Sequence, residues 1–158
     1  MDCFAEPVIG RRFAPTRWLA MTGPAMPQKI KTFLMFEGRC EEAIDFYVAL
    51  FPDAAVTGLL RYGPGEPGAE GSVKQATFTL AGQTFMAIDS PVKHGFTFTP
   101  AMSLFVDCAA EAEIDALFAK LSEGGQVLMP LNAYPFSPRF GWLSDKFGVS
   151  WQLNLASG

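Results

Sequence analysis

The chain has 158 residues, of which 49% are hydrophobic and fifteen are phenylalanine, enough apolar material for one ordinary domain or two small modules sharing a core. The formal net charge of −4 and the absence of a basic run exclude a nucleic-acid partner, and no apolar stretch is long enough to cross a membrane. The three cysteines, Cys3, Cys40 and Cys108, cannot all pair with one another, so we expect a protein of the reducing cytoplasm.

Residues 1–28 contain four prolines and three arginines and show no hydrophobic period. They also lack the apolar central run of a secretory signal. We expect them to be an N-terminal extension, either disordered or the result of a start assigned upstream of Met21 or Met26. The alternative is an arm that docks through Phe13 and Trp18.

The first regular unit is a strand followed by a helix. Residues 30–36 are almost continuously apolar, which is typical of a buried strand. Glu41 and Glu42 then occupy the first turn of a predicted helix, where the helix dipole favours negative charge. Apolar residues recur at three- and four-residue steps as far as Phe51, and Pro52 ends the helix.

A second copy of this strand–turn–helix unit begins at Met102. A shift of seventy residues without a gap aligns identical residues of the two copies, namely Leu34 with Leu104, Glu41 with Glu111, Ile44 with Ile114, Asp45 with Asp115, and Ala49 with Ala119. A match that preserves both apolar and acidic positions indicates an internal duplication.

Three short strands are predicted after each helix, at residues 54–62, 73–80 and 84–89, and again at residues 126–131, 140–143 and 149–155. The loops at residues 63–71 and 132–139 occupy equivalent places in the two copies. We therefore expect an α+β fold in which two βαβββ modules, residues 29–90 and 101–158, make up one domain over residues 29–158.

Four segments carry a family resemblance: FLMFEGRCEEAIDFYVALFP at residues 33–52, QATFTLAGQTFMAIDS at 75–90, LSEGGQVLMPL at 121–131 and FGWLSDKFGVSWQL at 140–153. In these segments the chain resembles the vicinal oxygen chelate superfamily, which includes glyoxalase I, the extradiol dioxygenases and the bleomycin- and fosfomycin-resistance proteins. Within it the chain resembles the PhnB-like group, also called the 3-demethylubiquinone-9 3-methyltransferase domain. The resemblance implies a cupped mixed sheet of the glyoxalase-like fold, a ligand inside the cup, and a homodimer.

The methyltransferase part of that group name receives no support from the residues. A Rossmann-type S-adenosylmethionine site needs a glycine-rich loop between a strand and a helix, and the sequence has none.

Many members of the superfamily hold a divalent metal in the cup through one ligand on each of four strands. The resemblance places those positions at Thr32, Met86, Met102 and Gln152. Divalent cations prefer carboxylate or imidazole ligands, which this set lacks. The single histidine, His94, is expected to be a solvated linker residue. We therefore expect no metal and no other cofactor.

Asp89 and Arg139 are the candidate polar residues of the site. Asp89 ends an apolar strand and is either a structural acceptor for nearby backbone amides or a contact at the cup rim, where it is also the candidate general base. Arg139 is the candidate for holding an anionic group. The expected ligand-binding residues are Gln75, Phe85, Met86, Asp89, Tyr134, Arg139, Trp142, Trp151 and Gln152.

The hypothesis that these features favour is a metal-independent, homodimeric protein that binds a small aromatic or anionic molecule, with neither nucleic acid nor membrane as a partner. One alternative is an enzyme of the same superfamily (a lyase, a dioxygenase or a resistance-type transferase) that uses a metal or acid–base chemistry through Asp89. Another is a protein whose cup is filled by its own side chains and which acts only through its dimer surface.

Overall fold

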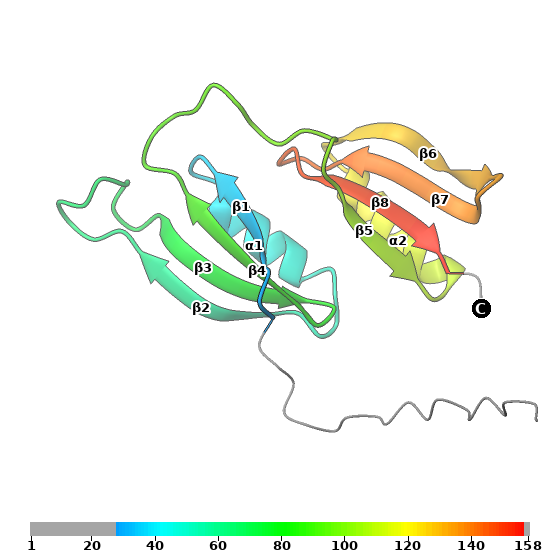
Figure 1. Ribbon diagram of the computed structural model, residues 1–158, viewed down its shortest axis with the longest axis horizontal. Helices are drawn as coiled ribbons and strands as arrows, with labels where there is room; N and C mark the ends of the chain where they lie inside the picture. The colour runs from blue at the N-terminus through cyan, green and yellow to red at the C-terminus, as the bar shows by residue number, and fades with distance from the viewer. Residues whose placement is uncertain (1–27, 157–158) are drawn as a thin grey trace, which may run out of the picture.

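The computed structural model describes residues 28–156, and the predicted extension lies, apart from Gln28, outside the described residues. The described chain consists of two units with the same order of elements (Figure 1). The first contains β1 (Thr32–Phe36), α1 (Cys40–Val48), β2 (Ala55–Arg61), β3 (Val73–Leu80) and β4 (Gln83–Asp89). The second contains β5 (Leu104–Cys108), α2 (Glu111–Ser122), β6 (Gln126–Tyr134), β7 (Ser137–Ser144) and β8 (Ser150–Leu155).

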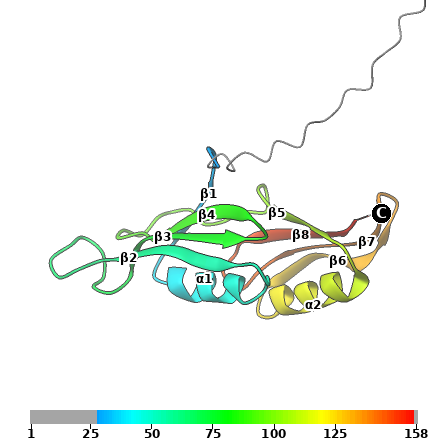
Figure 2. The ribbon, with the colours of Figure 1, turned by 90° about the horizontal axis from the view of Figure 1, so that it is seen from below.

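Each unit folds into a four-stranded mixed sheet, with strand order β1-β4-β3-β2 in the first and β5-β8-β7-β6 in the second. The first strand of each unit runs parallel to the last, and the other pairs are antiparallel. The expected α+β fold of two βαβββ modules is confirmed. Both helices cover the same side of the two sheets, and the opposite face of each sheet stays open (Figure 2).

Side-chain alternation along the strands determines which residues reach the helices and which reach the open face. In β1, Leu34 and Phe36 are buried toward α1, whereas Phe33 and Met35 point to the open face. The helices contribute the matching apolar stripes, and burying a large aliphatic or aromatic side chain stabilises the fold by about 1.5–3 kcal/mol. The core therefore lies on the helix side of the two sheets and forms one cluster across both modules.

The two modules do not align throughout with the predicted shift of seventy residues. Thr32 pairs with Phe85 where β1 begins, and Leu104 pairs with Trp151 where β5 begins, so the strands are related by a shift of 72 residues. The helices keep the shift of seventy residues, since Ile44 and Ile114 are their equivalent buried residues. The gapless alignment of the strands is therefore wrong, because the second module is two residues shorter between its first strand and its helix.

The predicted loop over residues 132–139 is also wrong. β6 continues to Tyr134 and β7 begins at Ser137, which leaves a tight turn between two long strands. Cross-strand contacts stabilise this hairpin, because the Tyr134 and Phe136 rings stack and the Tyr134 ring packs edge-on against Phe140.

A buried carboxylate holds the two modules together. Asp145, in the turn between β7 and β8, is 4% exposed and accepts four hydrogen bonds. Oδ2 accepts from the Tyr47 hydroxyl of α1 at 2.7 Å and from the Trp151 indole at 2.9 Å. Oδ1 accepts from the backbone amides of Phe147 at 2.8 Å and Val149 at 3.0 Å. The first helix is thereby attached to the second sheet.

Among residues 28–156, neither helix combines the length and the apolar character that a membrane crossing requires.

Candidate functional site

The open face of the second sheet carries a hollow of about 470 Å³, within the range of small-molecule sites. All four strands of the sheet contribute side chains to it. We call it the β5–β8 hollow, and its lining residues are Phe105, Met129, Phe136, Phe140, Trp142, Gln152 and Asn154. The lining is aromatic, with two carboxamides and no charged group.

The indole of Trp142 is held in place by the neighbouring strands. Trp142 is opposite Met129 on one side and Gln152 on the other. Its Nε1 donates to the Ser150 hydroxyl at 2.9 Å, and that hydroxyl lies 2.7 Å from the hydroxyl of Ser103. The polar edge of the indole is therefore satisfied while its ring lines the hollow.

The two carboxamides of the hollow differ in what remains available to a ligand. Asn154 donates to Asp107 at 2.7 Å and accepts from the Ser137 hydroxyl at 2.6 Å. The side chain of Gln152 makes no hydrogen bond within the described part of the chain. Gln152 therefore offers both a donor and an acceptor to a molecule in the hollow.

An aromatic wall closes one side of the hollow at the β6–β7 hairpin. The Phe136 ring lies 5.1 Å from the Phe140 ring, and the Phe140 ring lies 6.4 Å from that of Phe105. Phe136 is 67% exposed at the tip of the hairpin, so solvent reaches the outer end of this wall.

The strand pairing changes the positions at which a metal ligand is expected. Thr32 pairs with the buried Phe85 and so lies on the helix side, and Met102 precedes β5. The open-face residues of the paired strands are Phe33 with Met86 and Phe105 with Gln152. Two phenyl rings, a thioether and a carboxamide do not fit a divalent cation. Residues 28–156 contain no group of three histidine, cysteine or acidic side chains that is able to hold a metal ion.

The structure brings some of the expected ligand-binding residues together. Trp142 and Gln152 line the β5–β8 hollow, and Tyr134 stacks on Phe136 beside it. Gln75 and Met86 lie on the first sheet: Met86 pairs with the open-face residue Phe33, and Gln75 is exposed on β3.

The structure places other expected residues away from the open face. Phe85 is buried against Phe78, and Trp151 is 1% exposed in the core beside Asp145, because both side chains point toward the helices. Arg139 donates to Asp115 of α2 at 2.5–2.7 Å, also on the helix side. None of these three side chains points to the open face.

Asp89 is a structural acceptor for backbone amides, which is one of the two roles predicted for it. Its Oδ1 accepts from the backbone amides of Gly38 at 2.7 Å and Cys40 at 2.9 Å, and its Oδ2 accepts from the amide of Val73 at 3.3 Å. The carboxylate is 4% exposed. It holds the turn between β1 and α1 against β3 and does not face the β5–β8 hollow.

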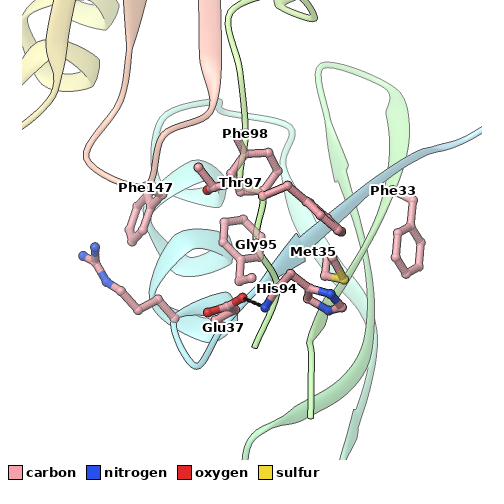
Figure 3. Close-up of a pocket in the computed structure, with 11 residues that line it drawn as sticks. Phe33, Met35, Glu37, His94, Gly95, Thr97, Phe98 and Phe147 are labelled. Atoms are coloured by element: carbon pink, nitrogen blue, oxygen red, sulfur yellow. Dashed lines mark hydrogen bonds between the residues drawn. The ribbon is translucent and has the colours of Figure 1, made fainter. Parts of the chain in front are cut away.

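Sequence reasoning did not single out Phe105, Phe140 and Asn154 as lining residues. The sequence signal for Phe105 was the alternation of side chains along its strand, because Phe105 lies between the inward-facing Leu104 and Val106. Sequence reasoning also treated residues 90–100 as a connection only, whereas part of this segment lines a second pocket at the end of β1 (Figure 3).

The chain has an α+β fold of two βαβββ modules and a ligand-sized aromatic hollow on the open face of a mixed sheet. This is the architecture of the glyoxalase-like proteins of the vicinal oxygen chelate superfamily. The family model described as 3-demethylubiquinone-9 3-methyltransferase matches residues 28–154. The chain therefore belongs to this family, the PhnB-like group of the superfamily.

Solved structures agree with this assignment. The chain is 61% identical to a PhnB protein from Bacillus cereus, with a TM-score of 0.81 over 82% of this chain and 100% of that one. It is 28% identical to a protein from Pseudomonas aeruginosa, with a TM-score of 0.73 over 83% and 99% of the two chains. A glyoxalase/bleomycin resistance protein from Albidiferax ferrireducens, 14% identical with a TM-score of 0.52 over 80% and 98%, shares the fold. No curated protein matches the chain.

Proposed function

We propose that this protein binds a small organic molecule with a flat apolar or aromatic body in the β5–β8 hollow, without a metal. The observation that carries the proposal is the side chain of Gln152, which has no hydrogen-bond partner within the described residues and lies beside the fixed ring of Trp142. Aromatic rings supply contact area, and one carboxamide orients a carbonyl or amide of the ligand.

The absence of charged side chains among the described residues that line the hollow narrows the class of ligand. Because Arg139 is paired with Asp115 on the helix side, no cation of this sheet faces the hollow. We therefore infer a ligand that is uncharged where it contacts the hollow. The acid–base alternative through Asp89 is not proposed, because both oxygens of its carboxylate are occupied by backbone amides.

We also propose that the protein works as a homodimer in the cytoplasm. In the described chain, β1 and β5 pair with one neighbour each, and their open-face residues Phe33 and Phe105 are more than half exposed. Exposed aromatic residues on edge strands are typical of an interaction surface. A second copy placed over them would cover the hollow from its open side. Cys40 and Cys108 are free thiols, which agrees with a reducing compartment.

Titration with naphthalene-2-carboxamide, followed by calorimetry, tests the binding proposal. We expect saturable binding that weakens about tenfold in Gln152→Ala, since a hydrogen bond contributes roughly 0.5–1.5 kcal/mol. Gln126→Ala is the matched control, because Gln126 is exposed at the start of β6 and does not line the hollow. Equal affinity in both variants would refute the proposed site, and stoichiometric metal in the purified protein would refute its metal independence.

A further inference from the structure

A second pocket, of about 640 Å³, lies where the linker of residues 90–103 crosses the end of β1. We call it the linker pocket. It has no lining residue in common with the β5–β8 hollow. Figure 3 shows its side chains coming from three parts of the chain, namely the end of β1 and the turn after it, the linker, and the turn between β7 and β8.

The walls of the linker pocket are phenyl rings that packing holds in place. The Phe36 ring lies 5.2 Å from the Phe98 ring and 6.3 Å from the Phe147 ring, and Phe36 is 5% exposed. Phe33 and Phe96 stand at the rim, at 53% and 65% exposure. A pocket with an ordered aromatic interior loses little conformational entropy when a ligand enters.

Glu37 is the carboxylate of this pocket. Its Oε1 accepts the backbone amide of His94 at 2.8 Å, which fixes the linker over the end of β1 (Figure 3). Glu37 has no ion-pair partner among the described residues. His94 is itself held by the Ser90 hydroxyl, which lies 2.8 Å from its Nε2, and its ring packs 4.9 Å from that of Phe96.

Two cations near the pocket share a single carboxylate, that of Glu42. Arg39 pairs with Glu42 at 3.0 Å and Lys146 pairs with the same carboxylate at 3.2 Å. The hydrogen bonds to Glu42 raise the pKa of the Arg39 guanidinium, which lies over the Phe147 ring at 4.5 Å. Glu37 is therefore the carboxylate that lines the pocket and has no ion-pair partner among the described residues.

We propose that the linker pocket is a second binding site, specific for an organic cation: a protonated amine attached to an aromatic or bulky apolar body. The faces of phenyl rings attract cations, and a carboxylate accepts the hydrogen bonds of an ammonium group. An anionic ligand is disfavoured by Glu37 and finds the Arg39 guanidinium occupied by Glu42 and by the carbonyl oxygen of Lys146. This site is independent of the ligand proposed for the β5–β8 hollow.

Three probes that share one ring system test this proposal: 1-naphthylmethylamine, which is protonated at neutral pH, 1-naphthalenemethanol and 1-naphthaleneacetate. We expect calorimetry to show the amine binding at least tenfold more tightly than the alcohol, and the carboxylate most weakly. The preference should decrease as salt is added, because the attraction between exposed charges is screened.

Substitutions then assign the preference to the pocket. Glu37→Gln keeps an oxygen acceptor for the His94 amide but removes the charge, so the amine and the alcohol should bind equally. Phe96→Ala, at an exposed rim position, should weaken both about fivefold or more. Glu123→Gln is the matched control, because Glu123 is exposed at the end of α2 and does not line either pocket.

Equal affinities for the amine and the alcohol in the unsubstituted protein would overturn the proposal, as would a preference that survives Glu37→Gln. Thermal unfolding of each variant shows that it is folded, and both substitutions lie at exposed positions. Gln152→Ala separates the two sites, because Gln152 lines only the β5–β8 hollow. Weaker binding of the amine to Gln152→Ala than to the unsubstituted protein would place the probe in the hollow and would also overturn the proposal.

Discussion

Two aspartates show how a single buried carboxylate determines local structure. Asp89 holds the turn after β1, and Asp145 holds the turn after β7 together with Tyr47 of α1. Burial, together with the charge of Asp145, raises the pKa of the Tyr47 phenol far above its usual value, so Tyr47 remains a hydrogen-bond donor at any physiological pH. In both cases the acidic residue supports the fold.

We predict that Asp145→Asn lowers the free energy of unfolding by about 2–4 kcal/mol, because the amide end of asparagine cannot accept the hydrogen bonds that one carboxylate oxygen receives. Urea unfolding measures the loss. Asp53→Asn, at an exposed position, should change stability by less than about 0.5 kcal/mol. Similar stabilities of the two variants would contradict the role given to Asp145.

The buried thiol of Cys40 makes the stability of the protein depend on pH. Burial, with a contribution from Asp89 and Glu41, raises the pKa of Cys40 from 9.0 to about 12. The unfolded chain therefore releases this proton at a lower pH than the folded chain. Stability from the neutral thiol is fully present below pH 9 and is lost as the pH rises toward 12.

We expect Cys40→Ala to remove that part of the pH dependence. Between pH 8 and pH 11 the native protein should lose on the order of 2 kcal/mol more stability than the variant, and urea unfolding at several pH values measures the difference. Cys108, whose pKa burial raises to about 11, remains in both proteins and contributes equally. A difference between the two proteins that does not change with pH would show that Cys40 ionises alike in the folded and unfolded chains.

At the scale of whole elements, the packing of α2 against β7 depends on a glycine. A methyl group on Gly141 would lie 2.4 Å from the ring of Phe118, so any larger residue pushes the helix and the strand apart. Gly58, in the corresponding sheet of the first module, has Thr77 at 3.8 Å and tolerates a methyl group. Of these two glycines, only Gly141 therefore has no room for a side chain.

We predict that Gly141→Ala costs about 2 kcal/mol of stability, within the range for an overpacked core, and that adding Phe118→Leu restores part of it. A double-mutant cycle by urea unfolding measures the coupling between the two positions. Gly58→Ala should have an effect of less than about 1 kcal/mol. If the costs of Gly141→Ala and Phe118→Leu simply add, the two side chains do not compete for the same space.

The whole molecule presents two open sheet faces that lie on the same side, opposite the two helices (Figure 2). Open-face phenylalanines on β1 and β5 would be covered in the proposed homodimer. The same association would enclose the β5–β8 hollow, and it would therefore couple ligand affinity to protein concentration.

We expect sedimentation velocity to show a dimer, and Phe33→Lys to weaken dimerisation at least 100-fold, about 2.7 kcal/mol or more, because a lysine ammonium in an apolar interface is left without a partner. Phe33 is already 53% exposed, so the variant should unfold near the temperature of the native monomer. Val92→Lys, at an exposed apolar position in the linker, is the control. A monomeric native protein would refute the homodimer.

Hydrophobic periodicity, together with the turn residues and the internal repeat, determined the two βαβββ modules. The apolar run of residues 30–36, the helix that follows and their recurrence from residue 102 are local patterns, and each depends on the geometry of one strand or one helix. The resemblance to the superfamily followed from the order of these segments, and the family match confirms it. Trp142 and Gln152 were expected as ligand contacts, and both lie on the open face.

Only the tertiary structure decided which way each strand residue points and what it meets there. A shift of one residue along a strand moves a side chain to the opposite face of the sheet, which is why Phe85 and Trp151 lie in the core while their neighbours Met86 and Gln152 do not. Asp145 with Tyr47 and Glu37 with His94 are 98 and 57 residues apart in the chain. Packing between distant elements brings such residues together, and no local pattern encodes it.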